Sequence, residues 1–147
     1  MLELDLTLAI LHHFFVFALF GVLFAEFVVV QRGMEAAAAA RVVAIDAWYG
    51  VLAALILIVG FSRAIFAAKG WDYYEHNAFF WAKIGTFVAI GILSVPPTLA
   101  FLKWRRARAA PTDAAVHQAR RYLWMEMALF PLLPAFAAAM ARGYGVF

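Results

Sequence analysis

The sequence predicts an all-α integral membrane protein, an antiparallel four-helix bundle that forms a single domain over residues 1–147. Hydrophobic residues make up 67% of the chain and charged residues only 14%, a composition outside the range of soluble domains. Four apolar stretches of about 20 to 25 residues could each cross a hydrocarbon core of ~30 Å. Short polar connections between them favour an up-and-down bundle.

The spans are predicted at residues 6–30, 42–66, 79–102 and 122–141. The first is interrupted only by His12, His13 and Glu26. No Lys or Arg precedes it, and it is longer than the core of a signal peptide, so we expect a retained anchor. Gly33 ends this helix, and an alanine run at 36–40 begins the next one before it enters the lipid.

The second connection contains three helix breakers and three aromatic residues suited to the membrane interface, and we expect it to be structured. In the third connection Pro111 is followed by Thr112 and Asp113, which predict a helix that begins outside the membrane. Prolines within the later spans are expected to kink them; they are Pro96, Pro97, Pro131 and Pro134.

Positive charges predict the orientation. Connections one and three carry eight of the 12 Lys and Arg residues, and four remain elsewhere. Such a bias places these two connections in the cytoplasm and both termini in the periplasm, if the protein lies in a bacterial inner membrane. Charges gathered beside the membrane point to topology and anionic lipid, and not to nucleic acid.

Three carboxylates lie near the cytoplasmic ends of the predicted spans, namely Glu26, Asp46 and Glu126. Carboxylates inside a membrane are candidates for a proton relay. A structural role is the alternative, because Arg41 and Arg121 each precede a carboxylate by five residues and ion pairs between them would lock the bundle. The sequence leaves both interpretations open.

Imidazoles and cations gather near the periplasmic ends. A neutral imidazole is a common ligand of b-type haem iron, and Lys and Arg suit the haem propionates. The candidate iron ligands are His13, His12 and His76, and the alternative is that they are hydrogen-bonded bundle histidines. Successive residues lie ~100° apart on a helix, so one histidine of the pair can face the interior; His12 is on the side of Glu26. Residues expected to pair with propionates or cover the site are Arg63, Lys83, Lys69, Tyr73 and Tyr74.

Several segments resemble a family of small bacterial predicted membrane proteins of unknown function. They read HHFFVFALFGVLFAE, DAWYG, GFSRAIFAAKGWDYYEHNAFFWAK and LSVPPT. The layout is more distantly similar to HemJ-type protoporphyrinogen oxidases and to the membrane part of CopD-like copper proteins. In the HemJ-type family an early histidine and a lysine shortly after a tryptophan are associated with haem or porphyrin. The resemblance implies those roles for His12 or His13 and for Trp81 and Lys83.

We therefore expect a membrane protein that binds haem b and transfers electrons to a membrane-soluble partner such as quinone. One alternative is an enzyme that oxidises a porphyrinogen, and another is a cofactor-free, proton-coupled transporter that uses the carboxylates. A structural subunit of a larger complex is a further possibility. The glycine and alanine content permits close approach of helices, so a homodimer or homotrimer in the lipid bilayer is expected.

Overall fold

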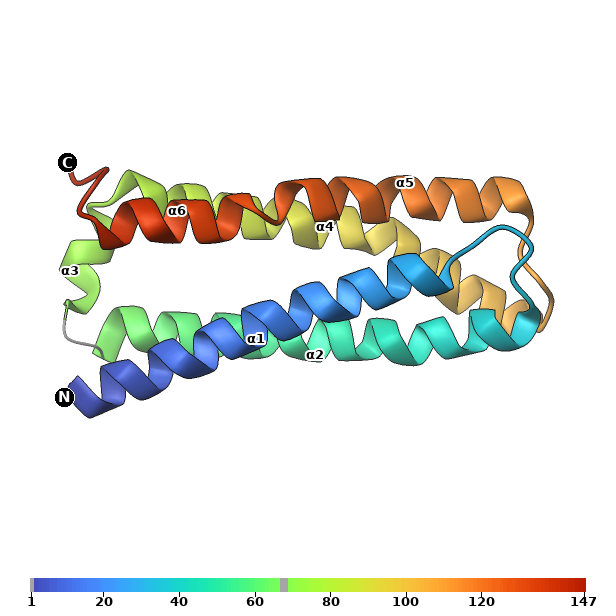
Figure 1. Ribbon diagram of the computed structural model, residues 1–147, viewed down its shortest axis with the longest axis horizontal. Coiled ribbons are helices and arrows are strands. Elements are labelled where there is room, and N and C mark those ends of the chain that lie inside the picture. The colour runs from blue at the N-terminus through green and yellow to red at the C-terminus, as the bar shows by residue number, and fades with distance from the viewer. Residues whose placement is uncertain (1, 67–68) are drawn as a thin grey trace.

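Four long helical runs lie along one axis in the computed structural model, which describes residues 2–66 and 69–147 (Figure 1). They are α1 (Leu2–Val29), α2 (Ala36–Phe66), α4 (Ala78–Ala107) and the consecutive pair α5 (Asp113–Leu129) and α6 (Leu132–Ala141). The short helix α3 (Gly70–Glu75) lies at one end of the bundle. Each run is long and apolar enough to cross a membrane, so the predicted four-span all-α fold is confirmed.

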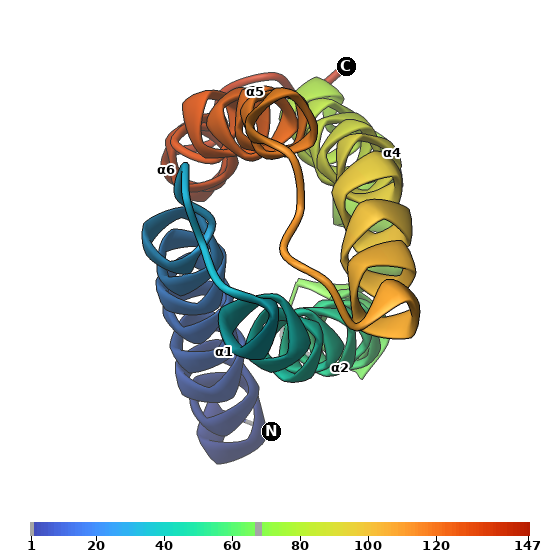
Figure 2. The ribbon, with the colours of Figure 1, turned by 90° about the vertical axis from the view of Figure 1, so that its right-hand side faces the viewer.

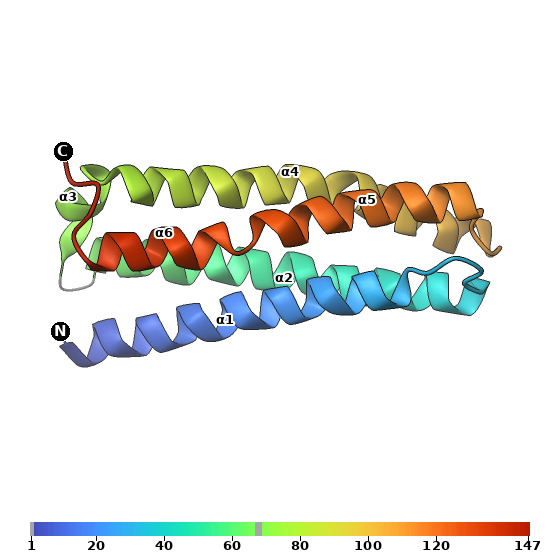
Figure 3. The ribbon, with the colours of Figure 1, turned by 45° about the horizontal axis from the view of Figure 1, so that its top comes forward.

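The helices form a closed ring when viewed along the axis (Figure 2). Neighbours in this ring are α1 with α2, α2 with α4, α4 with α5 and α6, and α5 with α1. Both termini lie at the end that also carries α3 (Figures 1 and 3). The other end carries the connection between α1 and α2 and the connection between α4 and α5, and most of the arginines lie in these connections or in the adjoining turns of the helices. The periplasmic location of the termini remains a prediction from the distribution of positive charge.

The core is a narrow stripe along the centre, and large apolar side chains cover the outside. Leu23, Phe101 and Leu123 are each 0% exposed. By contrast Phe17 is 74% exposed and Ile92 is 67% exposed. Apolar side chains on all faces of a helix are typical of a membrane span, because lipid replaces water as the surrounding solvent.

The prolines act differently in the two spans that contain them. The fourth span bends at a two-residue turn, Phe130 and Pro131, between α5 and α6 (Figure 3). Both residues keep right-handed helical backbone angles, and Pro131 and Pro134 cannot donate a backbone N–H, so the expected kink is present in this span. By contrast, α4 remains a single helix through Pro96 and Pro97.

The described part of the second connection, residues 69–77, is structured, as predicted, and it holds the C-terminal tail. Asn77 is 0% exposed and caps α4 by accepting hydrogen bonds from the N–H groups of Phe79 and Phe80. Its side-chain amide donates to the carbonyl of Tyr144 at 3.1 Å. The backbone N–H of Ala78 donates to the carbonyl of Gly145 at 2.8 Å. The tail is thereby fixed to the junction of α3 and α4.

Candidate functional site

Two glutamates and a tyrosine from three helices form a buried cluster in the middle of the bundle. Glu26 of α1 is 2% exposed, Glu126 of α5 is 1% exposed and Tyr49 of α2 is 6% exposed. The Tyr49 hydroxyl donates a hydrogen bond of 2.9 Å to Oε2 of Glu126. The other carboxyl oxygen, Oε1, is buried without a hydrogen-bond partner in both Glu26 and Glu126.

The helical register explains why these carboxyl groups are buried. On α1 the buried side chains are Leu19, Leu23, Glu26 and, just beyond the helix end, Val30. On α5 and just beyond it they are Val116, Ala119, Leu123, Glu126 and Phe130. Both series advance by three or four residues, which is the spacing of a single helix face. Each glutamate thus takes a position that otherwise belongs to an apolar core residue.

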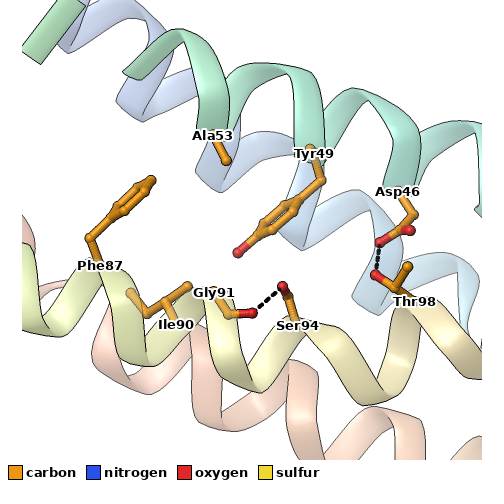
Figure 4. Close-up of a pocket in the computed structure, with 9 residues that line it drawn as sticks. Asp46, Tyr49, Ala53, Phe87, Ile90, Gly91, Ser94 and Thr98 are labelled. Atoms are coloured by element: carbon orange, nitrogen blue, oxygen red, sulfur yellow. Dashed lines mark hydrogen bonds between the residues drawn. The ribbon is translucent and has the colours of Figure 1, made fainter. Parts of the chain in front are cut away.

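Asp46 lies beside this cluster at the wall of a pocket between α2 and α4. Its Oδ1 accepts a hydrogen bond of 2.8 Å from the Thr98 hydroxyl (Figure 4). The pocket has a volume of about 200 Å³, and Tyr49 also lines it. Asp46 and Glu126 are both close enough to Glu26 to act on it electrostatically. The carboxyl groups of Glu26, Asp46 and Glu126, which come from three different spans, therefore lie close together in the bundle.

The arginines proposed as partners of these carboxyl groups do not pair with them. Arg41 and Arg121 are exposed, and within residues 2–66 and 69–147 no Lys, Arg or His nitrogen lies within 4.0 Å of the three carboxyl groups. The neighbouring Arg120 instead donates to the backbone carbonyls of Phe27 and Val30. Arg120 thus satisfies carbonyls at the C-terminal end of α1.

The two histidines of the first helix face different surroundings. His12 packs against α2, where a Cβ on Gly60 would lie 3.1 Å from its Cε1. Its Nδ1 is buried without a partner, and Lys83 lies close enough to act on the ring electrostatically. His13 is exposed on the outer surface, and its Nδ1 is 2.6 Å from the carbonyl oxygen of Ala9. The structure thus brings together His12 and Lys83 and leaves His13 apart.

The other cations and aromatic residues at this end have partners within the protein. Nε of Arg63 lies 3.1 Å from Oδ1 of Asp5. The ammonium group of Lys69 lies 4.2 Å from the ring centroid of Tyr73, and the Tyr73 hydroxyl donates to the carbonyl of Met140 at 2.9 Å. The indole of Trp81 donates to the carbonyl of Glu75 at 3.0 Å. Tyr74 is 7% exposed and packs against Phe80.

His76 lies at the surface and is held by α3 and the tail. Its Nδ1 is 2.9 Å from the carbonyl oxygen of Asp72, and this bond, with the nearby carboxylates of Asp72 and Glu75, raises the pKa of His76 above its ordinary value. Ligand atoms from these three residues lie within 4.8 Å of one another. Exposed groups of carboxylates and histidine such as this one are common without a metal. The described contacts of His76 are with α3 and with Phe147 of the C-terminal tail.

Sequence reasoning missed Tyr49, Thr98 and Asn77. Tyr49 follows Asp46 by three residues in the segment DAWYG, a spacing that puts both on one helix face. This spacing could have identified Tyr49 as a neighbour of Asp46. The partnership of Thr98 with Asp46 had no signal, because it depends on how α4 is rotated against α2.

Comparison with known proteins gives one result. The model of a family described as predicted membrane protein (DUF2214) matches residues 4–145. No curated protein and no solved structure matches the chain.

Proposed function

The chain belongs to the DUF2214 family of predicted membrane proteins, and we propose that it is a proton-coupled transporter whose proton-exchanging groups are Glu26 and Glu126. One observation carries this proposal. These two carboxyl groups are 2% and 1% exposed, each has an oxygen without a partner, and both lie within spans long enough to cross a membrane.

The cost of such an arrangement argues for a function. Ionisable groups inside a membrane are expensive and usually face a partner or a pathway. A buried carboxyl group without a cation is favoured in its neutral, proton-carrying form, and a cation that approaches it favours release of the proton. The hydroxyl of Tyr49 contacts Glu126 and can both donate and accept a hydrogen bond. This chemistry suits a site that takes up and releases protons.

The kink in the fourth span supports movement at the same site. The N–H of Phe130 donates to the carbonyl of Glu126 at 3.0 Å, and the regular helix gives way to a turn at Phe130 and Pro131. Transporters commonly place their sites at discontinuous helices, because the two halves can tilt against each other. Glu126 lies four residues before Phe130, so such a tilt would change the surroundings of its carboxyl group.

Proton flux into liposomes tests this function. The purified protein is reconstituted with a pH-sensitive dye inside the vesicles, and an outward potassium gradient with valinomycin drives protons inward. We expect the wild type to acidify the lumen faster than protein-free vesicles do, and Glu126→Gln to abolish the difference. Glu35→Gln, the same chemical change at an exposed position, and His13→Gln should retain the flux. Equal rates for wild type and Glu126→Gln would refute the proposal.

A second candidate function is favoured by His12. Its unpartnered buried Nδ1 and the adjacent Lys83 have the chemistry of an axial haem ligand and a propionate partner. A haem b bound there would supply electron transfer, with quinone or a porphyrinogen as its redox partner. The fit is partial, because Arg63 is already paired with Asp5 and Gly60 packs against the His12 ring.

The absorption spectrum tests the second candidate. Protein expressed with sufficient haem and purified in detergent should show a Soret band that sharpens on reduction. The band should be lost in His12→Ala and kept in His13→Ala, because only His12 faces the bundle. Folded wild-type protein without a Soret band would exclude haem binding and leave the proton-coupled function unaffected.

The proposal also includes location and assembly. We assign the protein to a bacterial inner membrane, with the arginine-rich connections in the cytoplasm, as a homodimer or homotrimer. The chain has no cysteine, so single cysteines can be introduced directly. A maleimide that does not cross membranes should label Tyr144→Cys from outside intact spheroplasts, and Arg108→Cys only after lysis. The opposite labelling pattern would reverse the orientation.

A further inference from the structure

The pocket between α2 and α4 has walls of two kinds (Figure 4). Phe87, Ile90 and Ala53 supply apolar surface at one end. Polar groups gather toward the other end, and they are Asp46, Tyr49, Ser94 and Thr98. A ligand that fits this pocket therefore has an apolar body and one polar end.

The polar wall offers acceptors and no free donor. The Tyr49 hydroxyl gives its proton to Glu126 at 2.9 Å. The Ser94 hydroxyl gives its proton to the carbonyl of Gly91 at 2.8 Å, and Thr98 gives its own to Asp46, also at 2.8 Å. Each hydroxyl has one proton to donate and two lone pairs. With these three hydroxyl protons directed to partners inside the protein, the wall favours a ligand whose polar end donates hydrogen bonds.

Asp46 adds a charge requirement to this pattern. It is the carboxyl group in the pocket wall, it is half-buried whereas Glu26 and Glu126 are fully buried, and no Lys or Arg among the described residues lies within 4.0 Å of it. Hydrogen bonds from a cation to a carboxylate are roughly twice as strong as neutral ones. An ammonium group, with three donors and a positive charge, satisfies more of these acceptors than a neutral hydroxyl does.

We propose that this pocket binds a small organic cation, a primary amine attached to an apolar ring, with Asp46 as its counter-ion. This inference rests on the proposed function, because it names the class of molecule that would be exchanged for protons. Tyr49 joins the pocket to Glu126. The charge of a bound ammonium group would favour release of a proton from the carboxyl cluster.

Two glycines allow the pocket to be filled without disturbing the bundle. Gly50 on α2 and Gly91 on α4 line it, and a Cβ at either position meets nothing within 4 Å. Gly91→Val therefore places a side chain in the ligand's space. Gly85 lies on the same helix, outside the pocket lining, and its Cβ position is also open, so Gly85→Val is the matched control for the effect of valine on α4.

Equilibrium dialysis of radiolabelled benzylamine against the detergent-purified protein tests the proposal, with protein-free micelles as the background. We expect saturable binding that Asp46→Asn and Gly91→Val each weaken about tenfold or more. Gly85→Val should bind as the wild type does. Benzyl alcohol, which has nearly the same shape but no charge, should fail to compete at concentrations where benzylamine saturates.

Two results would overturn the inference. The first is the absence of saturable benzylamine binding by the folded wild type, and the second is wild-type affinity in a folded Gly91→Val variant. A melting curve for each variant separates loss of binding from loss of fold. Because binding is measured without a membrane or a proton gradient, its failure leaves the liposome result intact. Conversely, binding without proton flux would support the pocket and refute the coupling.

Discussion

The hydroxyl of Tyr49 in α2 donates a hydrogen bond of 2.9 Å to Oε2 of Glu126 in α5, and this bond crosses the centre of the bundle. In the ring of helices α2 and α5 are opposite each other rather than adjacent (Figure 2). A side-chain bond between opposite helices ties together the two halves of the molecule, and it does so at the buried carboxyl cluster.

Loss of this bond should lower stability. In Tyr49→Phe the Glu126 carboxyl group stays buried and loses its only described side-chain partner. Leaving a buried polar group unsatisfied costs about 1–3 kcal/mol, so we expect a lower melting temperature in detergent. Tyr144→Phe is the control, because Tyr144 is 63% exposed. Equal melting temperatures for the two variants would show that the bond contributes nothing measurable.

Gly60→Ala should destabilise contact between α1 and α2. The new Cβ would lie 3.1 Å from Cε1 of His12, and overpacking costs about 1–3 kcal/mol. That cost exceeds the gain of about 0.5–1 kcal/mol from replacing a helical glycine. Gly85→Ala, where the same Cβ is unobstructed, should be neutral or stabilising in the same melting assay.

Repeating Gly60→Ala in a His12→Ala background tests whether a clash with the His12 ring causes the loss of stability. Since His12 is the side chain that the Cβ would meet, Gly60→Ala should cost less stability when His12 is absent. A penalty of the same size in both backgrounds would mean that the His12 ring does not define this contact.

Asn77→Ala should release the C-terminal tail as well as weaken α4. The side chain caps two backbone N–H groups and also donates to the carbonyl of Tyr144. Loss of an N-cap costs about 0.5–2 kcal/mol, and an additional cost is expected from the detached tail. Thr112→Ala removes the cap of α5, where only the N–H of Ala115 is bound, and should cost less.

Hydrogen exchange locates the effect of Asn77→Ala. The amide of Phe147 donates to the carbonyl of His76 at 3.0 Å. Its hydrogen-exchange rate should be higher in Asn77→Ala than in the wild type, and the rate in Thr112→Ala should equal that of the wild type. Protection of Phe147 in both variants would show that the tail is held by other contacts.

His76 should titrate above its ordinary pKa of 6.5. The cause is its bond to the carbonyl of Asp72, supported by the neighbouring carboxylates. Because the folded-state pKa is raised, the stabilisation is complete below the unfolded value and is lost as the pH rises through the folded value. Histidine ring signals followed by nuclear magnetic resonance give the midpoint. A midpoint at or below 6.5 would contradict this environment.

Much of the candidate site could be anticipated from residue spacing. The spacing of fourteen positions from His12 to Glu26 predicts that both lie on one side of the first helix, and both turn toward the bundle while His13 is exposed. The topology predicted that His12 and Lys83 lie at the same end of the bundle, and in the structure they are close to each other. The pairing of carboxylates with Arg41 and Arg121 followed equally plausible spacing and is absent from the described chain.

The four spans could be located from the sequence alone, because length and apolarity are local properties of a segment that must cross a membrane. The start of α5 could be located in the same way, since the side chain of Thr112 caps this helix. Which polar groups meet depends instead on the tertiary structure. Tyr49 reaches Glu126 and Thr98 reaches Asp46, and those contacts depend on the rotation of each helix against the others. That rotation is set by packing of the whole core, so no single segment of the chain encodes it.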